Sequence, residues 1–223
     1  ARRRHVDFRG APPAHGLWAL VLDASTLATS KALKHLAGFR PERIVVPNDS
    51  DGVFGPASAA HAVVLQGTSL HECLREPRGP TGGPFACVFC DFTCCLDGSW
   101  QPAQALEAPA GAGLRAPSGT SPKEDLQALF EGDNLDRGGT ILGVTLAHLR
   151  DPDRSARHRG SAPDQWERLR CLLGTLALRR GLCAIPLPGR IEQTAVATEF
   201  WLITPTLDAE LLGLAEEECA RWV

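Results

Sequence analysis

Two aspartates each close an apolar stretch of the chain, a position where a carboxylate can meet a ligand. Asp23 ends the stretch 16–23, and Asp91 ends the stretch 85–91. A carboxylate held at the end of a buried strand can bind an amino group or accept a proton from a reacting group. The alternative for Asp23 is to cap the helix that follows it. Trp100, in the loop beyond Asp91, is a candidate to stack on a planar substrate, with simple packing as the alternative.

Four cysteines lie close together around the second aspartate, and their spacing raises the question of a zinc site. They are Cys87, Cys90, Cys94 and Cys95. Thiolates at such spacing can close a tetrahedral zinc site, but the turns of such sites need glycine or polar residues between the thiols. Here the apolar pair Val88 and Phe89 intervenes, and strand alternation sends Cys87 and Cys90 to opposite faces. We therefore favour buried, reduced cysteines.

Basic residues gather after the fifth apolar stretch of the chain. His148 and Arg150 stand at its end, and the polar segment that follows carries further arginines. Both residues are candidates to bind an anionic substrate, with a solvated loop as the alternative. The chain contains no phosphate-binding loop, dinucleotide fingerprint, nucleophile elbow or zinc-protease motif.

Five apolar stretches without polar alternation are typical of strands covered on both faces, as in parallel sheets. They span 16–23, 43–47, 62–65, 85–91 and 140–146. Helical patterns lie between and after them, over 27–36, 56–61, 68–74, 122–135 and 166–180. Ser25 or Thr26 is expected to cap the first helix, and the glycines at 138 and 139 to end the fourth. Two further strands, 182–187 and 195–203, are expected to pair antiparallel, before a closing acidic helix over 207–222.

This alternation predicts one α/β domain with a doubly wound, mostly parallel seven-stranded sheet, an antiparallel C-terminal strand and helices on both faces. Residues 1–15 are expected to be a flexible lead-in and 16–223 the domain. A stretch near 97–121, rich in Gly, Ala, Pro and Ser, is expected to be a mobile insertion. Ligands in such sheets bind beyond the carboxyl ends of the strands.

The composition narrows the class of partner. The formal net charge is −3, which leaves no electrostatic footprint for non-specific nucleic-acid binding. No stretch approaches the roughly 18 to 20 apolar residues of a membrane span, so we expect no membrane contact. The eight cysteines sit largely in apolar stretches, which favours reduced thiols and an intracellular protein of the cytoplasm or nucleus.

The order of elements resembles that of class I S-adenosylmethionine-dependent methyltransferases over residues 16–204. The most specific part is 135–145, Leu-Asp-Arg-Gly-Gly-Thr-Ile-Leu-Gly-Val-Thr, which looks like the fifth strand of that family and the Gly-Gly turn before it. The long helix and final strand pair over 166–203 look like the family's closing hairpin. The resemblance implies S-adenosylmethionine as the small-molecule cofactor, lying over the ends of the first four strands.

The resemblance also implies roles for individual residues. Around the cofactor it places Asp23, Ser25, Thr26, Asn48, Gln66, Thr68 and Ser69. Asp91 would accept a proton or hydrogen bond from the group being methylated, Phe92 would pack against the substrate, and Thr93 is a weaker substrate contact. Two features depart from the family pattern: the loop after the first strand has no glycine, and Asn48 stands where an acid usually binds the ribose.

The favoured hypothesis is an S-adenosylmethionine-dependent methyltransferase that acts on a nucleic acid base or another planar amine. A non-catalytic relative of the same fold, serving as a binding or scaffolding domain, is the alternative, and the missing glycine-rich loop supports it. An enzyme that uses another nucleotide is a third hypothesis, weakened by the absent dinucleotide fingerprint. A zinc-dependent domain is the fourth.

Overall fold

The chain alternates strands and helices along its length. The computed structural model describes residues 16–23, 27–48, 63–66, 69–75, 84–92, 94–98, 120–147, 165–193 and 196–205. Their elements are β1 (Trp18–Val21), α1 (Ala28–Leu36), a 3-10 turn (Pro41–Arg43), β2 (Ile44–Asn48), β3 (Val63–Gln66), α3 (Leu70–Arg75), β4 (Phe85–Asp91), α5 (Pro122–Glu131), β5 (Thr140–Ala147), α6 (Gln165–Arg179), β6 (Cys183–Glu192) and β7 (Val196–Thr204). The lead-in, most of the insertion and the helices expected over 56–61 and 207–222 lie outside these residues.

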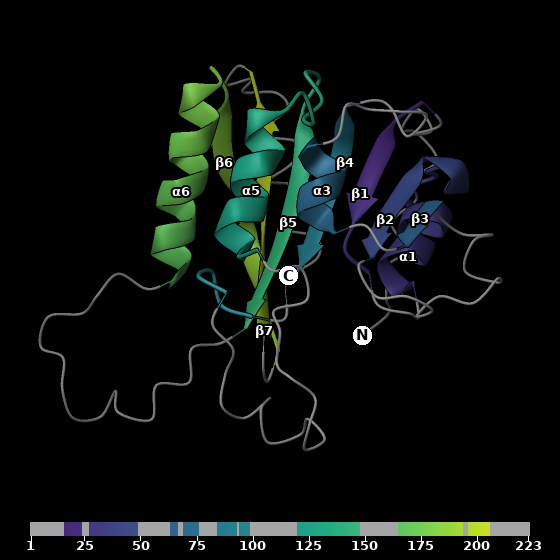
Figure 1. Cartoon of the computed structure of the whole chain (residues 1–223), viewed down its shortest axis with the longest axis horizontal. Coiled ribbons are helices and arrows are strands. Elements are labelled where there is room, and N and C mark those ends of the chain that lie inside the picture. The colour runs from purple at the N-terminus through teal and green to yellow at the C-terminus, as the bar shows by residue number, and fades with distance from the viewer. Residues whose placement is uncertain are drawn as a thin grey trace, which may run out of the picture.

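The strands form one sheet in the order β3-β2-β1-β4-β5-β7-β6 (Figure 1). β1 to β5 run parallel to one another, and β7 runs antiparallel to both β5 and β6. The predicted α/β fold, with a mostly parallel sheet and an antiparallel C-terminal pair, is confirmed. Strand order reverses between β1 and β4, and a reversal of this kind opens a crevice at the carboxyl ends of the strands.

Each face of the sheet has its own core. Figure 1 shows α3, α5 and α6 side by side in front of the sheet, and their apolar side chains pack on Leu20, Val88 and Leu142. We call this the α5 face. On the other face, which we call the α1 face, Leu27 and Leu33 pack against a smaller cluster that includes Ala19, Val21 and Ile44. The period of two in β1 explains why Leu20 and its two neighbours serve opposite cores.

The start of α1 depends on the carboxylate of Asp23. Leu27 precedes the helix with a φ of 49°, and no side chain at that position caps it. Instead Asp23 Oδ2 accepts hydrogen bonds from the backbone N and the Oγ of Ser30, both at 2.8 Å. Ser25 and Thr26, which were expected to cap this helix, lie outside the described residues, and among the described ones Asp23 caps it.

α5 also ends earlier than the sequence pattern indicates, at Glu131. The Nδ2 of Asn134 donates hydrogen bonds to the carbonyls of Ala128 and Leu74, at 3.2 Å each. These bonds close the last turn and tie α5 to α3. The prediction that the glycines at 138 and 139 end the helix is wrong, because they lie in the following turn into β5.

β6 is longer than predicted and crosses two prolines, at 186 and 188. It is an edge strand, where a missing N–H costs least. Its pairing with β7 shifts between Pro186 and Arg190, and Gly189 there has a φ of 94°. This irregularity accommodates the prolines, so β6 continues beyond residue 187, where the sequence pattern predicts its end.

Candidate functional site

The carboxyl ends of β1 and β4 bring the two strand-end aspartates together. Val21 pairs with Phe89, and Leu22 N donates to the Phe89 carbonyl at 2.8 Å. Asp91 ends β4 two residues after Phe89, on the same face of the strand, and Asp23 lies two residues beyond the end of β1, where it bonds to α1. Both acids therefore lie on the α1 face of the same edge. This is the edge at which the strand order reverses.

Asp91 has an environment that raises the pKa of its carboxyl. Burial of the carboxyl raises its pKa above the ordinary value, and the negative charge of Asp23 raises it further. A hydrogen bond from Thr145, its register partner on β5, acts in the opposite direction. The side chain stays accessible at the strand end. A carboxylate with a raised pKa is a better proton acceptor toward a weakly acidic group.

The two oxygens of Asp23 have different surroundings. Oδ2 holds the first turn of α1 through Ser30, whose side chain is fully buried. Oδ1 lies 3.5 Å from the backbone N of Thr29, which is a marginal contact. Asp23 is thus a helix cap, as one of the two sequence hypotheses held, and Oδ1 keeps most of its accepting capacity for a ligand.

The ends of β2 and β3 adjoin this edge. Asn48 and Gln66 are the last residues of their strands and pair with one another in register, so the backbone places both beside the β1 end. Ser69 is 8% exposed and forms a reciprocal capping box with Glu72: Ser69 N donates to Glu72 Oε2 at 2.8 Å, and Glu72 N donates to Ser69 Oγ at 3.2 Å. The hydroxyl of Ser69 is therefore engaged in starting α3.

Phe92 does not line the site. Its ring is 7% exposed and belongs to the core of the α5 face, so it anchors the chain after β4 and offers no surface to a substrate. Other predicted site residues lie outside the described part of the chain: Ser25, Thr26, Thr68, Thr93, Trp100, His148 and Arg150.

The segment after β4 is firmly attached. Ala147 N donates to the carbonyl of Cys94 at 3.1 Å, and Lys123 N donates to that of Leu96 at 3.3 Å. The Nε2 of Gln165 reaches the carbonyl of Ala147 at 2.7 Å. These bonds link the ends of β4, β5, α5 and α6, so Asp91 sits on a rigid support.

Sequence reasoning missed Thr145, which faces Asp91 from β5. Its Oγ1 lies 2.8 Å from the Oγ1 of Thr198 on β7, and both residues are buried. The signal was present in principle, because a parallel β4–β5 pair in this register aligns residues 91 and 145. Without the register, a threonine inside an apolar stretch gives no hint of a polar neighbour.

The cysteines are arranged as the sequence indicated. Cys90 points into the core of the α5 face, whereas Cys87 packs on the opposite side. Burial raises the pKa of Cys87 to about 12 and, as the largest cause, that of Cys94 to about 11. The described residues contain no group of side chains able to hold a metal ion.

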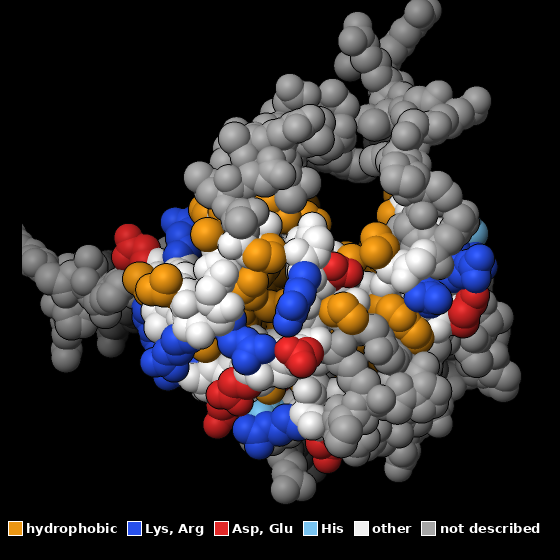
Figure 2. Space-filling model, turned by 90° about the horizontal axis from the view of Figure 1, so that it is seen from above, with side chains coloured by type: hydrophobic (Ala, Val, Ile, Leu, Met, Phe, Trp, Pro, Cys, Tyr) orange, Lys and Arg blue, Asp and Glu red, His pale blue; other side chains and the backbone are white. Residues whose placement is uncertain are grey.

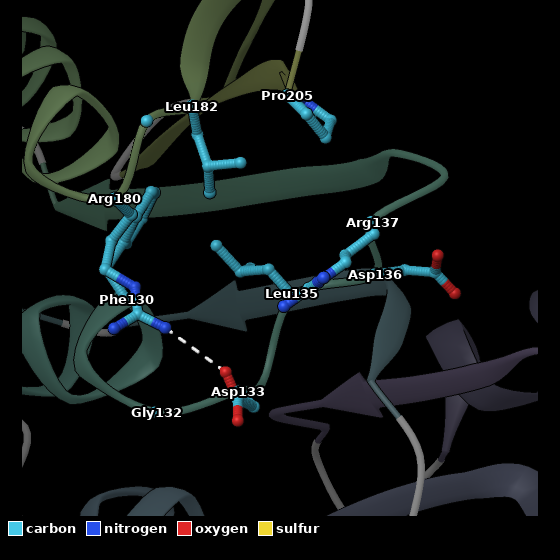
Figure 3. A pocket seen from close by; sticks show the side chains of 10 residues that line it. Phe130, Gly132, Asp133, Leu135, Asp136, Arg137, Arg180, Leu182 and Pro205 are labelled. Carbon is cyan, nitrogen blue, oxygen red and sulfur yellow. Dashed lines mark hydrogen bonds and ion pairs between the residues drawn. The ribbon is translucent and has the colours of Figure 1, made fainter.

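A cavity of about 250 Å³ lies at the other edge of the sheet, where the parallel strands begin. Figure 2 looks onto this edge, where apolar side chains lie among charged ones. Figure 3 shows Leu135, Leu182 and Pro205 lining the cavity, and Arg180 reaching across to Asp133 at 3.2 Å. The C-terminal ends of α5 and α6 meet here, so the arginine offsets the partial negative charge of helix ends. None of the sequence-predicted site residues lines this cavity.

No helix in the described part of the chain is long and apolar enough to cross a membrane.

Comparison with known proteins gives structural matches only. No family model matches the sequence, and no curated protein matches it. Among solved structures, the putative methyltransferase yhhF from Escherichia coli is 12% identical with a TM-score of 0.43, covering 86% of this chain and 78% of that one. A 16S rRNA (adenine(1408)-N(1))-methyltransferase from Catenulisporales acidiphilia is 11% identical with a TM-score of 0.44, over 87% and 88%. A methyltransferase from Pyrococcus furiosus is 13% identical with a TM-score of 0.42, over 84% and 75%. The solved structures that this chain resembles thus include methyltransferases, at a similarity too low to carry the assignment of its activity.

Proposed function

We propose that this protein is an S-adenosylmethionine-dependent methyltransferase whose cofactor binds at the carboxyl ends of β1 to β4. The observation that carries the proposal is the pair of carboxylates, Asp23 and Asp91, at the point where the strand order reverses. A crevice at this point is where open α/β sheets bind their ligands. Two neighbouring acids make its local charge negative.

The negative charge of this edge favours a cationic cofactor over one that carries phosphate. Dinucleotide and nucleoside phosphates bind where helix N–H groups are free to meet an anion. At α1 the carboxylate of Asp23 already occupies the N–H of Ser30, at 2.8 Å. A phosphate would meet a second anion there and be repelled. The amino acid end of S-adenosylmethionine carries an ammonium group, and its sulfonium is also cationic. The two carboxylates, which accept hydrogen bonds and carry negative charge, suit these groups.

When bound, the cofactor supplies an electrophilic methyl group. A nitrogen of the acceptor would take this methyl group as the carbon–sulfur bond breaks, and the electron pair of that bond would stay on sulfur. Asp91 takes the proton that the nitrogen loses, which its raised pKa favours. Asp23 Oδ1 binds the ammonium group, and Asn48 and Gln66 lie on the strands that would flank the nucleoside. The acceptor that suits this chemistry is a planar amine such as a nucleic acid base.

A binding domain without catalysis is the second candidate, and one observation favours it. The loop after β1 lacks glycine, and its positive φ falls on Leu27, whose side chain is 1% exposed. Glycine would let the backbone approach a ligand, whereas Leu27 is committed to the core.

Isothermal titration calorimetry with S-adenosylmethionine, S-adenosylhomocysteine and ATP separates the two candidates. The methyltransferase proposal expects micromolar binding of the first two and none of ATP. Asp23→Asn keeps an acceptor for Ser30 but removes the charge, and should weaken binding about tenfold or more, as for loss of a charge-assisted hydrogen bond. Asp133→Asn removes the same charge at the opposite edge and should leave affinity unchanged. Silence with both cofactor forms favours the binding domain, and tight ATP binding refutes the charge argument.

A further inference from the structure

A row of polar side chains crosses three neighbouring strands beside the proposed site. β4, β5 and β7 adjoin in the sheet (Figure 1). Asp91 on β4 pairs in register with Thr145 on β5, and Thr145 pairs with Thr198 on β7. The phenylalanine rings two residues away on β4 and β7 both lie against Gly143. Because a strand has a period of two, the three polar side chains of the row therefore share one face of the sheet.

The two threonine hydroxyls need an acceptor beyond each other. Thr145 is 3% exposed and Thr198 is 6% exposed, and their Oγ1 atoms lie 2.8 Å apart. Each hydroxyl carries one O–H, and the contact between them uses only one of the two. A buried donor without an acceptor is costly, so the second O–H needs a partner. The carboxylate of Asp91, which accepts a hydrogen bond from Thr145, supplies it.

The charge of Asp91 fixes the direction of both hydrogen bonds. A carboxylate has no proton to donate, so the O–H of Thr145 points to Asp91. Thr145 can then only accept in the 2.8 Å contact, and Thr198 is the donor there. Hydrogen bonds linked in this way polarise and strengthen one another. When Asp91 takes up a proton, its carboxyl becomes a donor, and both bonds can be kept with their direction reversed.

We propose that Thr145 and Thr198 are positioning residues that orient the Asp91 carboxylate and stabilise its charged form. We call the two hydroxyls the threonine relay. Burial of the carboxyl and the negative charge of Asp23, at the end of β1, both oppose the charged form. A further titratable neighbour among the described residues, the thiol of Cys90, points into the opposite core, and burial keeps it neutral by raising its pKa. The threonine relay acts against both opposing influences without adding a positive charge.

A neutral relay suits the proposed reaction, and its role there rests on the proposed function. A lysine or arginine beside Asp91 would also stabilise the carboxylate, but its positive charge would repel a sulfonium cofactor. When Asp91 accepts the proton of an acceptor nitrogen, the two hydroxyls turn and keep their own protons. Solvent then removes the proton from Asp91, whose side chain is exposed at the strand end. The carboxyl thus keeps one orientation in both charge states.

The proton affinity of the Asp91 carboxyl tests the threonine relay. It is followed by carbon-13 NMR in a pH titration of the full chain without ligand, and Asp91→Asn identifies the signal. Thr145→Val keeps the shape of the side chain but removes the donor, so the affinity should rise about three- to tenfold, as for loss of a hydrogen bond to a charged group. Thr145→Ser restores the hydroxyl and should return the affinity to within about twofold of the parent. Thr198→Val should change it in the same direction as Thr145→Val, but by less.

Thr140→Val is the matched control. Thr140 is also buried in β5, and its Oγ1 donates to the carbonyl of Phe85 at 2.7 Å. It lies at the opposite end of the strand from Thr145. Losing this buried hydrogen bond should destabilise the protein without changing the proton affinity of Asp91.

Two results would overturn the proposal. One is the parent affinity in Thr145→Val, and the other is an equal change in Thr140→Val, which would indicate a general effect of lost stability. If Thr145→Val fails to fold, Thr198→Val decides alone, because an unchanged affinity there excludes a relay. These titrations need no cofactor, so they stand apart from the calorimetry that tests the proposed function.

The rate of methyl transfer adds a second readout once an acceptor is found. Its pH profile should shift toward higher pH in Thr145→Val by the same factor as the proton affinity of Asp91, and return in Thr145→Ser. A profile that stays in place while the affinity changes would refute Asp91 as the proton acceptor and leave the threonine relay intact. Failure of the relay and failure of the proposed function therefore give different results.

Discussion

Replacing Gly143 with alanine should destabilise the protein, although the same exchange stabilises most strands and helices. A Cβ at this position in β5 would lie 2.6 Å from Cδ2 of Phe89 and 2.8 Å from Cε1 of Phe200. The two rings pack over the glycine with their centroids 6.3 Å apart. Both contacts are shorter than real Cβ atoms show, so both rings must shift to admit the methyl group.

The expected size follows from two opposing effects. Overpacking of this kind costs about 1–3 kcal/mol. Removing the flexibility of glycine from the unfolded chain returns about 0.4–1 kcal/mol. We therefore expect Gly143→Ala to lower the free energy of unfolding by about 1–2 kcal/mol, measured by urea unfolding followed by circular dichroism.

Gly174→Ala is the matched control. Gly174 lies in α6, and a Cβ there meets nothing within 4 Å. In a helix interior alanine is favoured over glycine by about 0.8–1 kcal/mol, so this variant should be more stable than the parent. Identical chemistry is thus expected to give opposite signs at the two positions.

A second exchange identifies the clash as the cause. Phe200→Leu shortens one of the two side chains above residue 143 and should recover part of the stability lost in Gly143→Ala. Residues in contact commonly show non-additive effects of about 0.5–3 kcal/mol. If Gly143→Ala is as stable as the parent, or if the two effects simply add, the close packing of the rings over β5 is not what fixes glycine there.

Three further outcomes are expected. Asp23→Ala removes the acceptor for Ser30 and should lower the free energy of unfolding by about 1–2 kcal/mol in urea titrations; a neutral result contradicts the capping role. Ser121→Ala breaks the capping box of α5 and should cost about 1 kcal/mol by the same measurement, unlike a substitution at an exposed position. Burial raises the pKa of Asp125 above 3.8, so the folded protein disfavours its charged form. Asp125→Asn can still accept a hydrogen bond from Thr120. Its melting temperature minus that of the parent should therefore increase as the pH is raised from 3 to 7, and a difference that does not change with pH refutes this.

The elements with the strongest patterns were predictable because local sequence decides them. The stretch 85–91 forms β4 with the predicted bounds. Its seven residues are largely apolar and too few for a typical helix, which favours a buried strand. The alternation that separates Cys87 from Cys90 also held, because it depends only on the period of a strand.

Element ends were less predictable because contacts distant in sequence determine them. α5 stops where Asn134 reaches Leu74, 60 residues away. β6 passes Pro186 because the strand lies at the sheet edge. Neither fact is visible in a local window, where glycine pairs and prolines are the natural places to end an element.

The candidate site, too, has features that the sequence predicts and features that it does not. Its two acids were found because each ends an apolar stretch, and the sheet then placed both strand ends at one edge. The resemblance implies a substrate contact for Phe92, yet its ring lies in the core of the α5 face. Proximity in sequence did not determine which face the side chain took.

Asp23 has a structural role at the candidate site, which limits the substitutions that its position tolerates. One carboxyl oxygen holds α1 in place through Ser30, and the other faces the edge of the sheet. A substitution of Asp23 that leaves no acceptor for Ser30 also alters the start of α1, whereas Asp91 stands at an accessible strand end. In the proposed site, a glycine-rich loop would let backbone N–H groups meet the cofactor directly. This chain has no glycine directly after β1, and the side chain of Asp23 fixes the start of α1 and keeps a carboxylate at this edge of the sheet.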